Sequence, residues 1–185
     1  MDYIVEKEVL FVKENLPQRK NIRLKNYNYN TPGTYFITIC TKNREEILST
    51  VGTGVLDGPH NNTTTFLKEY GKTIDKVINQ INDFYNNINI DKYVIMPNHI
   101  HLLLQITDKS SGNIIIGGDT PTTTIIAKLI STFKRFSHSE LGFNIWQNRS
   151  NDHIVRDEDD YLRIWQYIDE NPAKWEDDCF YKPVD

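Results

Sequence analysis

The sequence has few cysteines and no long hydrophobic run. Its two cysteines, Cys40 and Cys179, lie far apart in the 185 residues and in no spacing that is typical of a zinc site. We therefore expect neither a disulfide framework nor a cysteine-based metal site, and a reduced, cytoplasmic setting. No apolar stretch reaches membrane-spanning length and no signal-peptide pattern opens the chain, so we expect no membrane association.

The length and composition predict one globular domain with a buried core, since 38% of the residues are hydrophobic and 25% are charged. Residues 1–33 are polar and basic, residues 34–175 contain the periodic segments, and residues 176–185 form a short tail. We expect these three parts to be an N-terminal arm, the folded domain and a C-terminal tail.

Charge is unevenly distributed along a chain whose net charge is −4. From Asp157 onward there are ten acidic and three basic residues, whereas the stretch from Lys13 to Arg44 contains seven basic residues and one acidic residue. The seven are Lys13, Arg19, Lys20, Arg23, Lys25, Lys42 and Arg44. This asymmetry is typical of a protein with one phosphate-facing side, but a solvated basic arm without a partner explains it equally well.

Hydrophobic periodicity predicts an α+β protein. Strands are expected at residues 34–41, 88–96, 99–106 and 151–156, helices at 66–86, 125–141 and 158–171, and loops at 47–65 and 108–124. The order strand, helix, strand, strand, helix, strand is that of the ferredoxin-like (RRM-like) fold, an antiparallel βαββαβ sheet with two helices on one face. The last helix is an addition to that arrangement.

Two histidines stand at the start of the strand expected at residues 99–106. Because side chains alternate along a strand, His99 and His101 must share one face, while Ile100 and the alternate residues after it form a core face. Two imidazoles side by side can hold a metal ion, although a half-exposed face without a ligand fits the spacing as well. A third ligand and a nucleophile have to come from elsewhere in the chain.

The last expected helix places Tyr167 beside its packing stripe. Asp157 is suited to cap this helix, and a stripe at helical spacing is complete without the tyrosine. Tyr167 and Asn171 lie four residues apart and therefore share one flank of the helix. The flank could face the uncovered side of the sheet, or Tyr167 could be a partly buried aromatic residue with no chemical role.

Three segments together resemble the single-tyrosine HUH transposases, and among them the REP-associated tyrosine transposases of bacteria. They are Tyr27–Arg44, Tyr93–Leu104 and Trp146–Trp175, so the resemblance covers most of the chain from about residue 27 to 175. Its anchors are Pro-Asn-His-x-His, Trp-Gln, Asp-His-x-x-Arg and Tyr-Ile-x-x-Asn-Pro, in that order. Each motif alone is weak, whereas the ordered combination is specific.

The resemblance implies a metal-dependent endonuclease and strand transferase that acts on single-stranded or hairpin (REP-like) DNA in the bacterial cytoplasm, near the nucleoid. By this resemblance residues 34–175 would be the catalytic domain, with Tyr167 as the nucleophile that forms a 5′-phosphotyrosine. His99 and His101 would hold Mg²⁺ or Mn²⁺, and Asn171 would complete the metal site. The residues implied in DNA binding are Arg19, Lys20, Arg23, Lys25, Lys42, Arg44, Trp146, Gln147, His153 and Arg156. The resemblance assigns the last four of these either to shaping the site or to touching DNA.

Two alternatives remain open at the level of sequence. One is a non-catalytic module that binds hairpin DNA or RNA on the same fold. The other is a zinc hydrolase built on the histidine pair, for which the sequence offers no evident acidic third ligand nearby. The oligomeric state is also open, because the protein could be a monomer or a homodimer in which subunits exchange the tyrosine helix.

Overall fold

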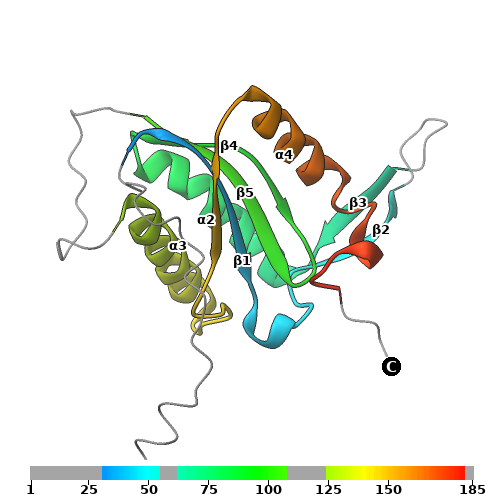
Figure 1. Ribbon diagram of the computed structural model, residues 1–185. Coiled ribbons are helices and arrows are strands. Elements are labelled where there is room, and N and C mark those ends of the chain that lie inside the picture. The colour runs from blue at the N-terminus through cyan, green and yellow to red at the C-terminus, as the bar shows by residue number, and fades with distance from the viewer. Residues whose placement is uncertain (1–30, 55–61, 108–123, 182–185) are drawn as a thin grey trace, which may run out of the picture.

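A four-stranded antiparallel sheet is the centre of the protein. The computed structural model describes residues 31–54, 62–107 and 124–181. The sheet consists of β1 (Gly33–Cys40), β4 (Ile88–Ile95), β5 (His99–Ile106) and β6 (Asn151–Val155), in the spatial order β4-β5-β1-β6 (Figure 1). This is the strand order of the ferredoxin-like fold, so the predicted α+β class and arrangement are confirmed.

Two helices cover one face of this sheet, α2 (Glu69–Phe84) and α3 (Ile125–Leu141) (Figure 1). The main hydrophobic core lies between them and the strands, and the alternate β5 residues predicted to face inward all belong to it. These residues are Ile100, Leu102, Leu104 and Ile106. The Thr124 hydroxyl accepts a hydrogen bond from Ala127 N at the start of α3, and Gly142 ends that helix with a positive φ of 81°.

The opposite face of the sheet is covered by α4 (Glu158–Glu170) (Figure 1). Asp157 caps it as predicted, because its carboxylate accepts a hydrogen bond from Asp160 N at 2.8 Å. Ile164 and Ile168 pack against Leu103, which lies on the same β5 face as the histidines. The helix therefore lies across the histidine face.

One loop expectation is wrong. Residues 47–65 contain most of a β-hairpin, in which β2 (Ser49–Gly54) pairs antiparallel with β3 (Asn62–Leu67). The glycines and the polar threonines indicated a loop, but threonine is β-branched and favours extended backbone. The start expected for the following helix is also wrong, because Phe66 and Leu67 belong to β3 and α2 begins only at Glu69.

Two short 3₁₀ helices lie near the end of the sheet at which β1 ends and β5 begins. The helix η1 (Lys42–Arg44) follows β1, and η2 (Trp175–Asp177) follows α4. The chain after η2 runs back towards the start of β5, so that residues 178–181 lie at the histidine end of the sheet (Figure 1).

Several predicted segments lie outside the described residues. These are residues 1–30 of the basic arm, including Arg19, Lys20, Arg23 and Lys25, residues 55–61 and 108–123 of the two expected loops, and residues 182–185 of the expected tail. Among the residues that the structure describes, no helix is long and apolar enough to cross a membrane.

Gly71 in α2 gives a direct test of this packing. On helix propensity alone, Gly71→Ala would stabilise the protein by about 1 kcal/mol. A Cβ at this position, however, would lie 2.0 Å from the backbone oxygen of Leu48. We expect the clash to dominate and to lower the free energy of unfolding by about 1–3 kcal/mol in urea denaturation.

The matched control is Gln80→Ala, at an exposed position of the same helix, which should change stability by less than about 0.5 kcal/mol. A Gly71→Ala variant at least as stable as the parent would contradict the close approach of α2 to Leu48.

Candidate functional site

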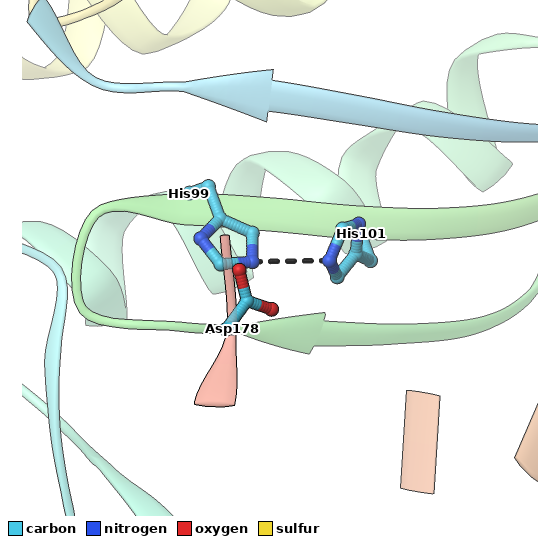
Figure 2. A group of neighbouring side chains, drawn as sticks. All are labelled: His99, His101 and Asp178. Carbon is cyan, nitrogen blue, oxygen red and sulfur yellow. Dashed lines mark hydrogen bonds between the residues drawn. The ribbon is translucent and has the colours of Figure 1, made fainter. Parts of the chain in front are cut away.

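The two histidines of β5, His99 and His101, lie together where this strand begins, and both side chains are fully buried. Their Nε2 atoms are 3.0 Å apart (Figure 2). The prediction that His99 and His101 share one face of the sheet is confirmed. In the antiparallel register they lie opposite Cys40 and Thr38 of β1, two residues apart on the same face. The histidine face thus carries a pair of imidazole nitrogens close enough to bind one ion.

Each histidine is oriented through its other ring nitrogen. His99 Nδ1 lies 2.9 Å from Asn98 Oδ1, and His101 Nδ1 lies 2.9 Å from the Thr38 hydroxyl. The Asn98 amide nitrogen donates to the carbonyl oxygen of Phe180 at 2.8 Å, which fixes the amide oxygen towards His99. An amide oxygen only accepts, so His99 donates from Nδ1 and, when neutral, keeps a lone pair on Nε2.

Burial keeps both imidazoles neutral. Desolvation, with a further contribution from the charge of Arg44, lowers the pKa of His99 to about 3. Desolvation and then the neighbouring His99 lower the pKa of His101 well below its usual value. Both rings are therefore uncharged near pH 7, which is the form that binds metal ions.

Tyr167 of α4 reaches the same place. Its hydroxyl lies 3.3 Å from His101 Nε2 and 3.4 Å from Asp178 Oδ2. The ring stacks edge-on against Phe36 and His101, and 39% of the residue is exposed. Burial, and then the charge of Asp178, raise the pKa of Tyr167 to about 12. A phenol that is accessible from outside thus lies beside the histidine pair within a single chain.

Asn171 lies one turn beyond Tyr167 and is almost completely buried. Its amide nitrogen donates to Asp178 Oδ2 at 3.2 Å. Its buried Oδ1 has no hydrogen-bond partner among the residues that the structure describes. A buried amide oxygen without a donor is costly, and a bound cation would satisfy it.

Asp178 was missed by the sequence reasoning. One nitrogen from each of His99 and His101 and one oxygen of Asp178 all lie within 4.8 Å of one another (Figure 2). The sequence offered no evident acidic ligand near the histidines, and the fold brings one there. The sequence carries no signal for this contact, because Asp178 follows η2 in a short acidic tail with no periodicity.

The donor set fits a divalent metal ion. Two neutral imidazole nitrogens of buried histidines and the carboxylate of half-buried Asp178 lie close together, and the amide group of Asn171 contacts that carboxylate. Imidazole nitrogens combined with oxygen donors can hold several divalent ions, so this donor set does not by itself select Mg²⁺ or Mn²⁺.

No family model matches the sequence. An uncharacterized protein of Haemophilus influenzae is 35% identical over 177 residues, which cover 88% of this chain and 93% of that protein. The chain belongs to the same family as that protein.

Two further similarities connect this family to transposases. A putative REP-associated tyrosine transposase of Haemophilus influenzae is 25% identical over 155 residues, which cover 82% of this chain and 77% of that protein. A solved REP-associated tyrosine transposase bound to a REP hairpin has the same fold, with a TM-score of 0.55 and 20% identity over 83% of this chain and 74% of the other. The resemblance inferred from the sequence is confirmed, and the fold is transposase-like.

The motif Asp-His-x-x-Arg of this transposase-like protein lies at the far edge of the sheet. His153 Nε2 lies 2.9 Å from the carboxylate of Asp160, which also pairs with Arg163 and accepts from Arg156 N. His153, Arg156 and Arg163 line an open cavity of about 390 Å³ near the start of α4. Both Arg156 and His153 are exposed, which is compatible with contact to DNA. That contact stays a prediction.

Trp146 lies in the hydrophobic core. Its ring is completely buried and packs against Phe133 at a centroid distance of 5.4 Å. The prediction that it touches DNA is thus unsupported, because contact would require the ring to leave the core. Gln147 beside it is half-buried, and its carbonyl oxygen accepts from Lys134 at 2.7 Å.

The two predicted DNA-binding residues of η1 differ in their surroundings. Lys42 is exposed. Arg44 instead donates from Nη1 to the carbonyl oxygen of Cys179 at 2.8 Å, and its guanidinium lies 4.8 Å from the centre of the Phe180 ring. In this structure Arg44 holds the C-terminal tail against the sheet, and its role towards DNA stays a prediction.

Proposed function

We propose that this protein is a metal-dependent endonuclease and strand transferase that cuts single-stranded DNA beside a hairpin through a 5′-phosphotyrosine intermediate. One observation carries the proposal: the Tyr167 hydroxyl lies 3.3 Å from His101 Nε2 at a buried histidine pair. A nucleophile and a candidate metal site within reach of the same phosphate are what such a reaction requires. The similarity to tyrosine transposases supports a transposase-like enzyme.

In this proposal Tyr167 attacks the scissile phosphorus. The phenol oxygen forms the new P–O bond and loses its proton, while the bond from phosphorus to the 3′-oxygen breaks and that oxygen takes up a proton. The DNA strand is thereby attached to the protein at its 5′ end, and the free 3′-hydroxyl can reverse the reaction on the same or another strand. The covalent intermediate divides one difficult step into two easier ones.

His99, His101 and Asn171 would hold the Mg²⁺ or Mn²⁺ ion. A divalent ion held there would supply Lewis acidity that polarises a non-bridging phosphate oxygen and stabilises the charge developing in the displacement. Asn98 and Thr38 orient the two imidazoles, so that the nitrogens facing the site need little rearrangement. Phe36 and His101 pack against the Tyr167 ring and limit its movement.

The proposed DNA partner is a hairpin with single-stranded flanks. The solved transposase of similar fold is bound to a REP hairpin, which supports this class of partner for the present chain. Exposed Lys42, Arg156 and His153 offer contacts for phosphates, and the basic arm before residue 31 adds more positive charge. Because Tyr167 and the histidines meet within one chain, a monomer can contain the complete site.

A covalent-adduct assay tests the proposal. The full-length protein is incubated with 3′-end-labelled hairpins carrying randomised single-stranded flanks, with Mg²⁺ or Mn²⁺ or with EDTA. After denaturation, we expect label to migrate with the protein only when a divalent ion is present. Cleavage without attached protein would instead favour a hydrolase, and tight binding without cleavage in either metal would favour the non-catalytic module.

A further inference from the structure

The tail after α4 is fixed at the histidine end of the sheet. The carbonyl oxygen of Phe180 accepts from Asn98, and that of Cys179 accepts from Arg44, both at 2.8 Å. The Phe180 ring also lies 4.6 Å from the ring of His99. Asn98 therefore connects the two parts directly, because the same amide group contacts His99 and the tail.

This anchoring presents Asp178 to the site with both carboxylate oxygens oriented. Oδ1 accepts from the backbone nitrogen of Phe180 at 2.7 Å. Oδ2 accepts from Asn171 at 3.2 Å and from Tyr167 at 3.4 Å. Oδ1 accepts a single hydrogen bond and keeps its second lone-pair direction free, so these bonds leave Asp178 able to bind an ion.

The charges around Asp178 point to a cation as its missing partner. The carboxylate lies beside two neutral imidazoles, and no described ion pair with a lysine or arginine neutralises it. Arg44 is directed to the Cys179 carbonyl and the Phe180 ring. Asn171, which is almost fully buried and donates to Asp178 Oδ2, has an amide oxygen without a hydrogen-bond partner among the described residues, and a nearby cation would satisfy that oxygen.

We propose that Asp178 is the negatively charged ligand of the metal, added to His99, His101 and Asn171, and that the amide nitrogen of Asn171 positions its carboxylate. The inference rests on the proposed function of this site and adds to it a ligand from outside the motifs. It makes the tail part of the catalytic unit: residues 176–181 would belong to the site, and the domain boundary expected at residue 175 would cut through it.

Metal binding, measured without DNA, tests this role. Full-length parent, Asp178→Asn, Asp177→Asn and His99→Ala proteins are titrated with Mn²⁺, and free Mn²⁺ is followed by electron paramagnetic resonance. Asp177 is the matched control because it is an exposed neighbour and its substitution changes the charge equally. We expect Asp178→Asn to weaken Mn²⁺ binding by about tenfold or more, because even residues that only hydrogen-bond to metal ligands contribute about this much to metal affinity. The Mn²⁺ affinity of Asp177→Asn should stay within about twofold of the parent.

The outcomes separate this inference from the proposed function. Binding by Asp178→Asn within twofold of the parent, or an equal loss in Asp177→Asn, would overturn the role of Asp178 and leave the adduct chemistry of Tyr167 standing. A parent protein that binds Mn²⁺ no better than His99→Ala would overturn both. A second measurement covers the case in which a substitution lowers stability. The melting temperature of each variant is measured with and without Mn²⁺, and the rise caused by Mn²⁺ is compared between variants.

Discussion

Tyr167→Phe is expected to abolish the covalent protein–DNA adduct while leaving hairpin binding within a fewfold of the parent. The substitution removes only the hydroxyl oxygen, which is the atom that would bond to phosphorus. The ring keeps its edge-on contacts with Phe36 and His101, so α4 should stay in place. Adduct is measured by denaturing gel, and binding by fluorescence anisotropy of a labelled hairpin.

Tyr161→Phe is the matched control for this prediction. Tyr161 lies on the same helix, and its hydroxyl donates to Asp91 at 3.2 Å, away from the histidines. Its loss should leave adduct formation within a fewfold of the parent. Adduct formed equally by Tyr167→Phe would show that another residue is the nucleophile.

His99→Ala has the second large expected effect. We expect metal-dependent cleavage to fall by about three orders of magnitude, which corresponds to roughly 4 kcal/mol of lost transition-state stabilisation. Hairpin binding should be largely retained, because the predicted DNA contacts lie on other elements. Single-turnover cleavage over a range of Mn²⁺ concentrations, together with anisotropy, measures both effects.

The control is His138→Ala, which removes an exposed imidazole from the last turn of α3, away from the sheet face that carries the site. It should leave cleavage unchanged. Because His99 is buried, circular dichroism must show that His99→Ala is folded. A variant that loses its fold would support a structural role, and one that cleaves normally would contradict the metal site.

The strand carrying the histidines was predictable for a simple physical reason. Alternation along β5 is strict, so the hydrophobic residues assign the core face and leave His99 and His101 on the other. Helical spacing likewise placed Tyr167 and Asn171 on one flank of α4. What periodicity could not show was that this flank meets the histidines, since that depends on how α4 crosses the sheet.

The remaining parts of the site depend on contacts between residues far apart in the sequence, which no periodic pattern of residues indicates. Asp178 reaches the histidines because the tail turns back and is held by Asn98 and Arg44. Trp146, which the resemblance assigned to shaping the site or touching DNA, is buried in the core, because a short motif does not record which side chains point inward. The β2–β3 hairpin was missed because its threonines and glycines favour loops and strands in different contexts.

Mapping the covalent bond tests the central claim most directly. Adduct formed on the hairpin library with Mn²⁺ is digested with nuclease and protease, and the modified peptide is sequenced by tandem mass spectrometry. We predict a residual 5′-linked nucleotide on Tyr167. A nucleotide on any other residue, or cleavage of the hairpin with no modified peptide, would contradict the assignment of Tyr167 as the nucleophile.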